Sequence, residues 1–189
     1  MNRSEFFRAC SGGLCACVGG GAMAEASSQT AAGSPREDWR VRFVQRRYAK
    51  LIGILSEKMD VSSVNAILHE LGRYCASTNG RLAEFRGDLD GYRALIKRSV
   101  SGDDVAFDQE KGVITVTSPE RSDCFCPLVS VAAQTPEVAC SCSLGWHRET
   151  WETVTGKEVE VELKESVLRG GKRCVFEVRV LKENASGAA

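Results

Sequence analysis

The first third of the chain carries apolar residues at helical spacing. A helix is predicted to open at Ser34-Pro35, and a second follows with Asp60 or Ser62 as its cap. Each has a stripe of apolar residues that is expected to face the core. The stripes are Val41, Val44, Tyr48, Leu51, Ile52, Leu55 and Met59 in the first helix, and Val64, Ile67, Leu68, Leu71 and Cys75 in the second.

A third helical segment spans residues 82–96, with Leu82, Phe85, Leu89, Tyr92 and Ile96 on one side. Glycine is a poor helix former, so Gly87 and Gly91 predict that this segment divides into two pieces. A late helix is predicted to begin at Ser143 and to end near Gly156.

Beyond residue 104 the apolar period becomes two, which indicates strands. Strands are predicted at 105–107, 113–117, 124–131, 158–168 and 173–181. The last two form a hairpin around the turn Arg169-Gly170-Gly171-Lys172. Its inward residues are Val159, Val161, Leu163 and Val167, then Cys174, Phe176, Val178 and Val180.

These elements predict an α+β fold. N-terminal helices pack on an antiparallel sheet of about five strands, with one late inserted helix and a C-terminal β-hairpin. The expected organisation is an export signal and linker over 1–32, a single domain over 33–183 and a frayed tail over 184–189.

Composition narrows the function classes. Apolar residues make up 43% of the chain and charged residues 26%, as in globular proteins. The formal net charge is zero, which argues against a nucleic-acid partner, because polyanion-binding surfaces leave a basic excess. No apolar run approaches the roughly 20 residues of a transmembrane helix.

The N-terminal residues resemble an export signal, which predicts an exported or periplasmic protein. Arg3 and Arg8 give a positive start, and Ala22-Met23-Ala24 is a small-x-small cleavage site. The start is similar to a twin-arginine signal, although Ser4 stands in place of the second arginine. The alternatives are a lipoprotein lipidated at Cys17 and a plain Gly/Ala tail. Cleavage after Ala24 leaves six cysteines.

Two matched cysteine pairs are the main chemical feature: Cys124 with Cys126, and Cys140 with Cys142. If each pair lies on a strand, both of its sulfurs point to one side, and two facing pairs make a tetrahedral thiolate site. Zinc or an iron–sulfur cluster uses such ligands. Disulfides between the two pairs, or free thiols, remain alternatives.

Three further residues are candidates for catalysis. Cys142 precedes the predicted helix start, where the helix dipole favours a thiolate nucleophile. His147, one turn on, is a candidate base or ligand, whereas His69 is interpreted as a surface residue. Glu165 occupies an inward position of the hairpin, where a carboxylate must be paired, protonated or functional; a bulge that turns it outward is the alternative.

Several motifs resemble those of a cysteine-rich bacterial family: Cys124-Phe-Cys-Pro-Leu128, Cys140-Ser-Cys-Ser-Leu-Gly-Trp146, Gly156–Phe176 and Leu71–Ala76. More distantly, the closing Gly-x-x-x-Cys-x-Phe is similar to the L-2-amino-thiazoline-4-carboxylate hydrolase family and to the 4-vinyl reductase domain. Both similarities imply a ligand pocket between helices and sheet. The hydrolase family has an aspartate-bearing stretch where this chain has Cys140-Ser-Cys142.

Three functions are compatible with these features. The first is an exported module in which the four paired cysteines hold a metal or cluster beside a pocket for a small molecule. The second is a hydrolase of a small sulfur or nitrogen heterocycle, with a Cys142 thiolate or metal-bound water as nucleophile and Glu165 as acid or base. The third is a structural domain stapled by disulfides.

Overall fold

The computed structural model describes residues 39–181. The expected export signal and linker over 1–32, both ends of the domain expected over 33–183, and the C-terminal tail lie outside these residues. The helices are α1 (Trp39–Lys58), α2 (Val61–Ser77), α3 (Leu89–Lys97) and α4 (Cys140–Thr155), and the short 3₁₀ turns are η1 (Leu82–Phe85), η2 (Glu137–Ala139) and η3 (Val167–Arg169). The strands are β1 (Asp104–Asp108), β2 (Val113–Thr117), β3 (Val159–Glu165) and β4 (Val175–Val180).

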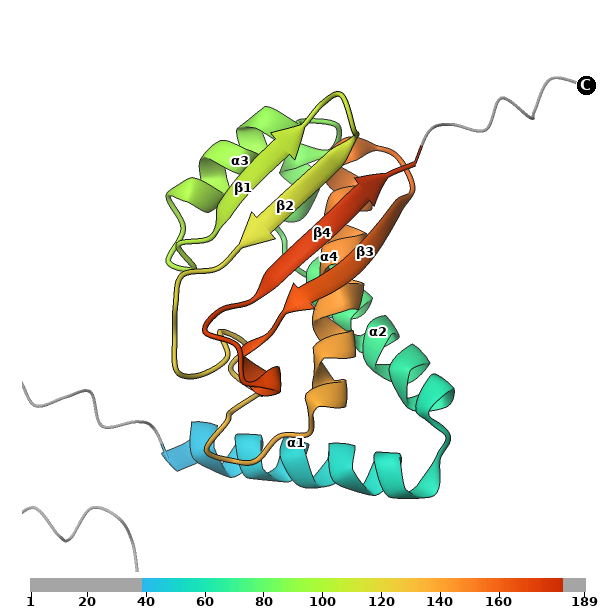
Figure 1. Cartoon of the computed structure of the whole chain (residues 1–189), viewed down its shortest axis with the longest axis vertical. Helices are drawn as coiled ribbons and strands as arrows, with labels where there is room; N and C mark the ends of the chain where they lie inside the picture. Colours follow the sequence, from blue (N-terminus) through green and yellow to red (C-terminus); the bar gives the residue numbers. More distant parts are fainter. Residues whose placement is uncertain (1–38, 182–189) are drawn as a thin grey trace, which may run out of the picture. The chain divides into compact units, whose positions relative to one another are not determined.

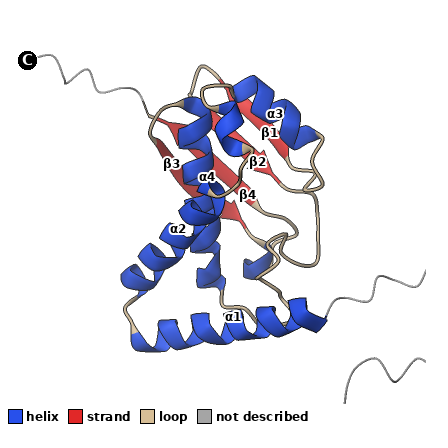
Figure 2. Cartoon of the chain, turned by 180° about the vertical axis from the view of Figure 1, so that it is seen from behind, coloured by secondary structure: helices blue, strands red, loops and turns tan. Residues whose placement is uncertain are grey.

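The four strands form one antiparallel sheet in the order β1-β2-β4-β3. Figure 1 looks onto the open face of this sheet, and Figure 2 shows α3, α4 and α2 on its other face. The α+β class, the late helix and the closing hairpin are therefore confirmed, although the late helix begins at Cys140 and not at Ser143. The division of segment 82–96 into η1 and α3 is confirmed as well. Within residues 39–181, no helix is both long and apolar enough to cross a bilayer.

The fifth strand, predicted over 124–131, is wrong. The carboxylate of Asp123 accepts hydrogen bonds from the backbone N–H groups of Cys124 and Val131, each at 2.8 Å, and from the hydroxyl of Ser130 at 2.9 Å. These bonds fold the segment back on itself. Its backbone groups are consequently turned toward one side chain instead of toward a neighbouring strand.

The core lies between the sheet and α4. Trp151 is completely buried, and its ring meets Tyr92 of α3 edge-to-face with 5.6 Å between ring centroids. Ile114 of β2 pairs with Val178 of β4, and both are fully buried against this layer. The alternating pattern of the sequence predicted this inward face, because the outer positions of the same strands are polar.

Helices α2 and α4 touch through their backbones. A Cβ atom on Gly72 would lie 1.9 Å from the carbonyl oxygen of Cys142, and one on Gly145 would lie 1.9 Å from the carbonyl oxygen of His69. Only glycine permits this approach at both positions. Polar contacts flank the crossing: the Ser141 hydroxyl donates to Asn65 at 2.7 Å, and Arg73 pairs with Glu149 and Glu152 at 2.7 and 2.9 Å.

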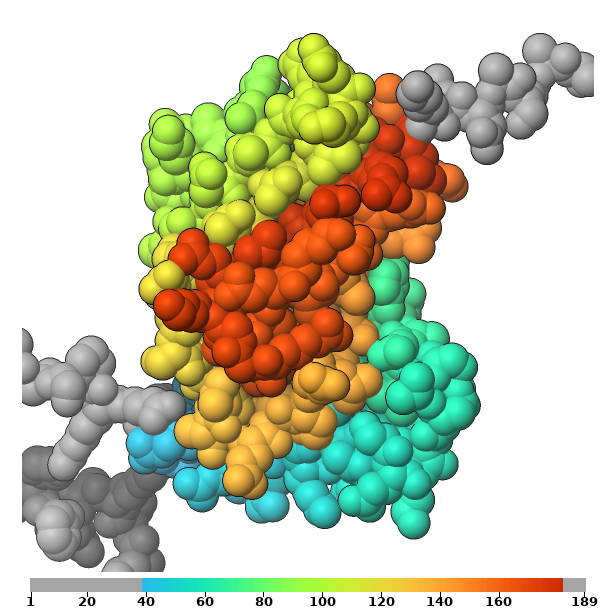
Figure 3. Space-filling model, viewed as in Figure 1, coloured from blue at the N-terminus to red at the C-terminus, as the bar shows by residue number. Residues whose placement is uncertain are grey.

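Helix α1 confirms only part of the predicted stripe: Ile52 is buried, and Tyr48 and Leu55 pack beside it. Its buried residues are Gln45, Ala49 and Ile52, whereas Leu51 and Val44 are exposed. The reason is that apolar residues occur on both sides of this helix, and only one side meets α2 and the start of α4. Figure 3 shows α1 along one border of the molecule.

We expect Gly72→Ala and Gly145→Ala each to lower the free energy of unfolding by about 1–3 kcal/mol, because the helices must separate to admit a methyl group. Chemical denaturation followed by circular dichroism measures this. Gly53→Ala in α1 is the matched control, since a Cβ there meets nothing within 4 Å. It should be neutral or slightly stabilising. Equal effects at all three positions would contradict the close crossing.

Candidate functional site

The cysteines of the described residues come from four separate segments. Cys75 lies near the end of α2, Cys124 and Cys126 in the loop after β2, Cys140 and Cys142 in the first turn of α4, and Cys174 just before β4. All six are free thiols. The strand geometry expected for the two pairs is wrong, because one pair lies in a loop and the other in a helix, where positions i and i+2 point in nearly opposite directions.

Four of these thiols gather near Tyr48 of α1. Burial raises the pKa of Tyr48, and the nearby thiols of Cys142, Cys126, Cys75 and Cys124 raise it further, in that order. Such electrostatic effects require the groups to lie close together. Gln45, one turn before Tyr48, donates a 3.1 Å hydrogen bond to the carbonyl of Pro127 and so attaches the loop to α1. We call Cys75, Cys124, Cys126 and Cys142 the Tyr48 thiol group.

Burial disfavours the thiolate form of three members of this group, Cys124, Cys126 and Cys142. Burial raises the pKa of Cys142 to about 12, and the neighbouring Cys126 thiol adds to the effect. Burial likewise raises the pKa of Cys124 to about 11. Burial of Cys142 thus acts against the thiolate that the start of the helix was expected to favour, and its role as a nucleophile stays a prediction.

Cys140 faces a different neighbourhood. Its sulfur lies 3.1 Å from the hydroxyl of Ser166 in a buried contact, and Arg169 and Cys174 lie near enough to affect its pKa. Within residues 39–181, no three His, Cys, Asp or Glu side chains stand in positions that would hold a metal ion. The zinc or iron–sulfur centre at Cys124, Cys126, Cys140 and Cys142 stays a prediction; Cys124 lies near both Cys126 and Cys140, whereas the thiols that affect Cys142 are those of Cys126, Cys75 and Cys124.

His147 faces the sheet. Its Nδ1 accepts a 3.3 Å hydrogen bond from the indole N–H of Trp151, and its ring centroid lies 3.9 Å from that of Phe176. Burial lowers the pKa of His147 to about 3, so the imidazole is neutral at physiological pH. Cys142 instead packs against the cluster of Ile52, Val64 and Leu68.

Glu165 closes the hairpin turn. A bulge between Leu163 and Glu165 shifts the pairing of β3 with β4. The Glu165 carboxylate then accepts hydrogen bonds from the backbone N–H groups of Lys172 and Arg173 at 2.8 and 3.3 Å. No hydrogen bond or ion pair within 39–181 joins Glu165, His147 and Cys142. Their catalytic roles stay predictions.

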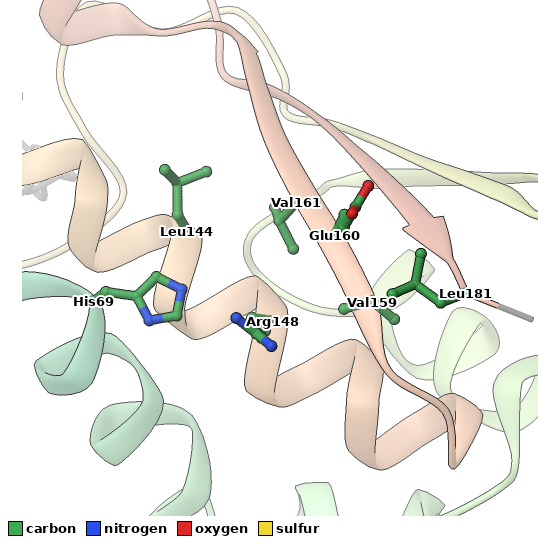
Figure 4. Close-up of a pocket in the computed structure, with 7 residues that line it drawn as sticks. All are labelled: His69, Leu144, Arg148, Val159, Glu160, Val161 and Leu181. Atoms are coloured by element: carbon green, nitrogen blue, oxygen red, sulfur yellow. The ribbon is translucent and has the colours of Figure 1, made fainter. Parts of the chain in front are cut away.

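A cleft of about 380 Å³ lies between the paired helices and β3. Figure 4 shows side chains from α2, α4, β3 and the end of β4 around it. The apolar lining is Leu144, Val159, Val161 and Leu181, and the polar lining is His69, Arg148 and Glu160. The family resemblance implied a pocket between helices and sheet, but sequence reasoning missed the residues of this one, because His69 was interpreted as a surface residue and nothing in the local pattern singles out Arg148.

The polar side of the cleft consists of a neutral imidazole, a cation and the carboxylate of Glu160, which pairs with Arg179 at 3.4 Å. Burial lowers the pKa of His69, and the positive charges of Arg148 and Arg73 lower it further. Arg148 donates to Glu152 at 2.9 Å and remains partly exposed. The arrangement therefore offers hydrogen-bond donors beside an apolar wall.

No protein-family model and no curated protein matches the chain. Among solved structures, it is similar to trafficking protein particle complex subunit 3 from Naegleria fowleri covalently bound to palmitic acid, at 15% identity and TM-score 0.51, covering 77% of this chain and 98% of that one. This similarity shows a shared fold.

Two other solved structures are similar at lower scores. The phenol-responsive sensory domain of the transcription activator PoxR, solved with phenol, is 13% identical with TM-score 0.48, and the match covers 75% of this chain and 76% of that chain. A vinyl-4-reductase family protein from Methanocaldococcus jannaschii is 14% identical with TM-score 0.35, at 79% and 99% coverage. The distant group named from the closing hairpin is thus among these structures, whereas the cysteine-rich family stays a prediction.

We expect Cys142 in the folded chain to react with iodoacetamide roughly a thousandfold more slowly than in the urea-unfolded chain at pH 8, because its pKa of about 12 lies well above the ordinary 9.0. The rate should rise about tenfold per pH unit up to pH 10, since only the thiolate reacts. Mass spectrometry of peptides after timed alkylation measures this. A rate that levels off below pH 8 would reveal a low-pKa nucleophile instead.

Proposed function

We propose that this chain is a small-molecule-binding domain whose ligand lies in the cleft between α2, α4 and β3. The observation that carries the proposal is the pairing of an apolar wall with the donors His69 and Arg148. A volume of about 380 Å³ falls within the range of small-molecule sites, which are mostly apolar with a few polar groups that orient the ligand.

The charge of the cleft selects the ligand class. Arg148 is always protonated and keeps free donor capacity, because Glu152 engages it from one side. Val159 and Val161 point toward the helices from β3 (Figure 4). These groups favour a compact apolar molecule with one carboxylate, sulfonate or similar acceptor group. The close contact between α2 and α4 sets the backbone of His69 against Gly145, which follows Leu144 in sequence. This contact holds the cleft open before the ligand arrives.

The test uses 1-anilinonaphthalene-8-sulfonate, an aromatic anion that fluoresces in apolar sites. We expect saturable binding to the folded chain, and Arg148→Met should raise the Kd about tenfold through loss of a charge-assisted hydrogen bond. Arg81→Met is the matched control, because Arg81 is an exposed arginine outside the cleft and its ion-pair partner Glu84 does not line the cleft either. Its Kd should equal that of the unchanged chain. Equal weakening by both variants, or no saturable binding, would overturn the cleft as the site.

A second function is favoured by the Tyr48 thiol group. Four soft donors converge from three segments of the chain, and this donor set suits zinc or a similar thiophilic ion. These thiols do not stand at metal-ligand positions in the structure, so we propose that the side chains of Cys75, Cys124, Cys126 and Cys142 move together to hold such an ion, with Cys75 in place of Cys140. The metal would supply folding free energy by tying α2, the loop after β2 and α4 together.

Cobalt titration distinguishes the two ligand sets. We expect one Co²⁺ per chain with thiolate charge-transfer absorption, and apparent affinity that rises with pH, since raised thiol pKa values mean that the metal must displace protons. Cys75→Ser should abolish or sharply weaken binding, and Cys140→Ser should leave it intact. The reverse result would restore the set predicted from sequence, and absence of the absorption would exclude the metal.

A further inference from the structure

Helix α1 concentrates positive charge on an otherwise neutral chain. It contains six basic residues and one acidic residue, Glu57, whereas the formal net charge of the whole sequence is zero. The basic residues are Arg40, Arg42, Arg46, Arg47, Lys50 and Lys58. The helix therefore carries a net charge of +5, and the remainder of the chain carries the balancing negative charge.

The same helix exposes large apolar side chains. Trp39 is 65% exposed, Phe43 49%, Leu51 51% and Ile54 41%. A rotation of 100° per residue places Phe43 and Ile54 opposite the buried residue Ile52. These side chains cannot all be covered by the body of the domain, because α1 meets it along one narrow stripe.

Apolar and basic groups are interleaved on this outward face. The rings of Trp39 and Phe43 meet edge-to-face with 6.3 Å between centroids, and the guanidinium of Arg47 lies 4.6 Å from the centre of the Phe43 ring. Lys50 lies on the same side of the helix, between Arg47 and Ile54 in sequence. We call Trp39, Phe43, Arg47, Lys50 and Ile54 the outer face of α1.

We infer that the outer face of α1 docks on an anionic lipid bilayer. Amphipathic helices that lie in the bilayer interface combine aromatic and aliphatic side chains with lysine and arginine, which is the composition seen here. Figures 1 and 2 both show α1 as a straight bar along one end of the domain, with its outer side turned away from the sheet. At 1.5 Å per residue, 20 residues give about 30 Å of helix that can lie flat on a surface.

Charge argues against two other occupants. A symmetric contact between two copies through this face would bring together two helices of +5 each, which repel. Residues 1–38 contain Arg3, Arg8 and Arg36 against four acidic residues, a balance of −1 that cannot neutralise the helix. Anionic headgroups supply charge of the required sign and density, and each basic residue near such a surface adds to the attraction.

The test is vesicle co-sedimentation of the full chain. Vesicles of phosphatidylcholine with 30% phosphatidylglycerol, chosen as the probe, should bind the chain, and vesicles of phosphatidylcholine alone should bind it at least tenfold more weakly. Trp39 is a built-in reporter, because Trp151 is fully buried and Trp146 partly buried. Its fluorescence should shift to the blue on binding, and Trp39→Phe should remove the shift.

Two double variants that change the net charge by the same amount distinguish the effect of the outer face of α1 from the effect of overall charge. Arg47→Glu with Lys50→Glu should weaken binding to the anionic vesicles at least tenfold, and 0.5 M salt should do the same. Arg86→Glu with Lys97→Glu is the control, because these exposed residues flank or lie in α3, at the opposite end of the domain from α1 (Figure 2). It should bind within about twofold of the unchanged chain.

Equal binding to both kinds of vesicle, or equal loss in both double variants, would overturn the inference. Phe43→Ser tests the apolar part, and far-UV circular dichroism of each variant verifies the fold. Analytical ultracentrifugation without lipid tests whether the outer face of α1 instead contacts a second copy of the chain. If the chain does not bind the vesicles and forms a dimer that Phe43→Ser dissociates, the outer face of α1 is a contact with a second copy, and membrane docking is contradicted.

Discussion

The backbone contact between α2 and α4 is the constraint on which the other features depend. Two glycines face each other's helices, and each stands where a methyl group would overlap a carbonyl oxygen. The carbonyl against Gly72 belongs to Cys142, and the carbonyl against Gly145 belongs to His69. One crossing thereby places a member of the Tyr48 thiol group and a lining residue of the cleft. Interiors pack tightly, so widening this contact would displace both.

The sequence predicts the sheet better than it predicts the helix faces. The closing hairpin alternates apolar and charged residues, and such alternation admits only one register. Helix α1 lacks that constraint, because apolar residues surround most of it and the pattern cannot say which stripe is buried. The loop at 124–131 was misread for another reason: its conformation depends on the Asp123 carboxylate, and side-chain hydrogen bonds of this kind leave no periodic trace.

The candidate sites show a similar division. Cysteine spacing drew attention to the right residues, yet the same i, i+2 spacing means one direction on a strand and nearly opposite directions on a helix. Cys142 consequently joins the thiols near Tyr48 while Cys140 turns to Ser166. The family resemblance implied a pocket between helices and sheet, but the residues that line the cleft could not be predicted. His69 and Arg148 come from two helices, and only their packing brings them to one site.

Helix α1 connects the proposed thiol site with the proposed membrane-docking face. Its inner side carries Gln45, which holds the loop of Cys124 and Cys126 through the Pro127 carbonyl, and Tyr48, which lies among the thiols. Its outer side carries the aromatic and basic residues that we assign to a bilayer. None of the thiols lies on α1 itself, so the helix is joined to this region through the Gln45 hydrogen bond and the packing of Tyr48 and Ile52, and its outer side is left open for a partner.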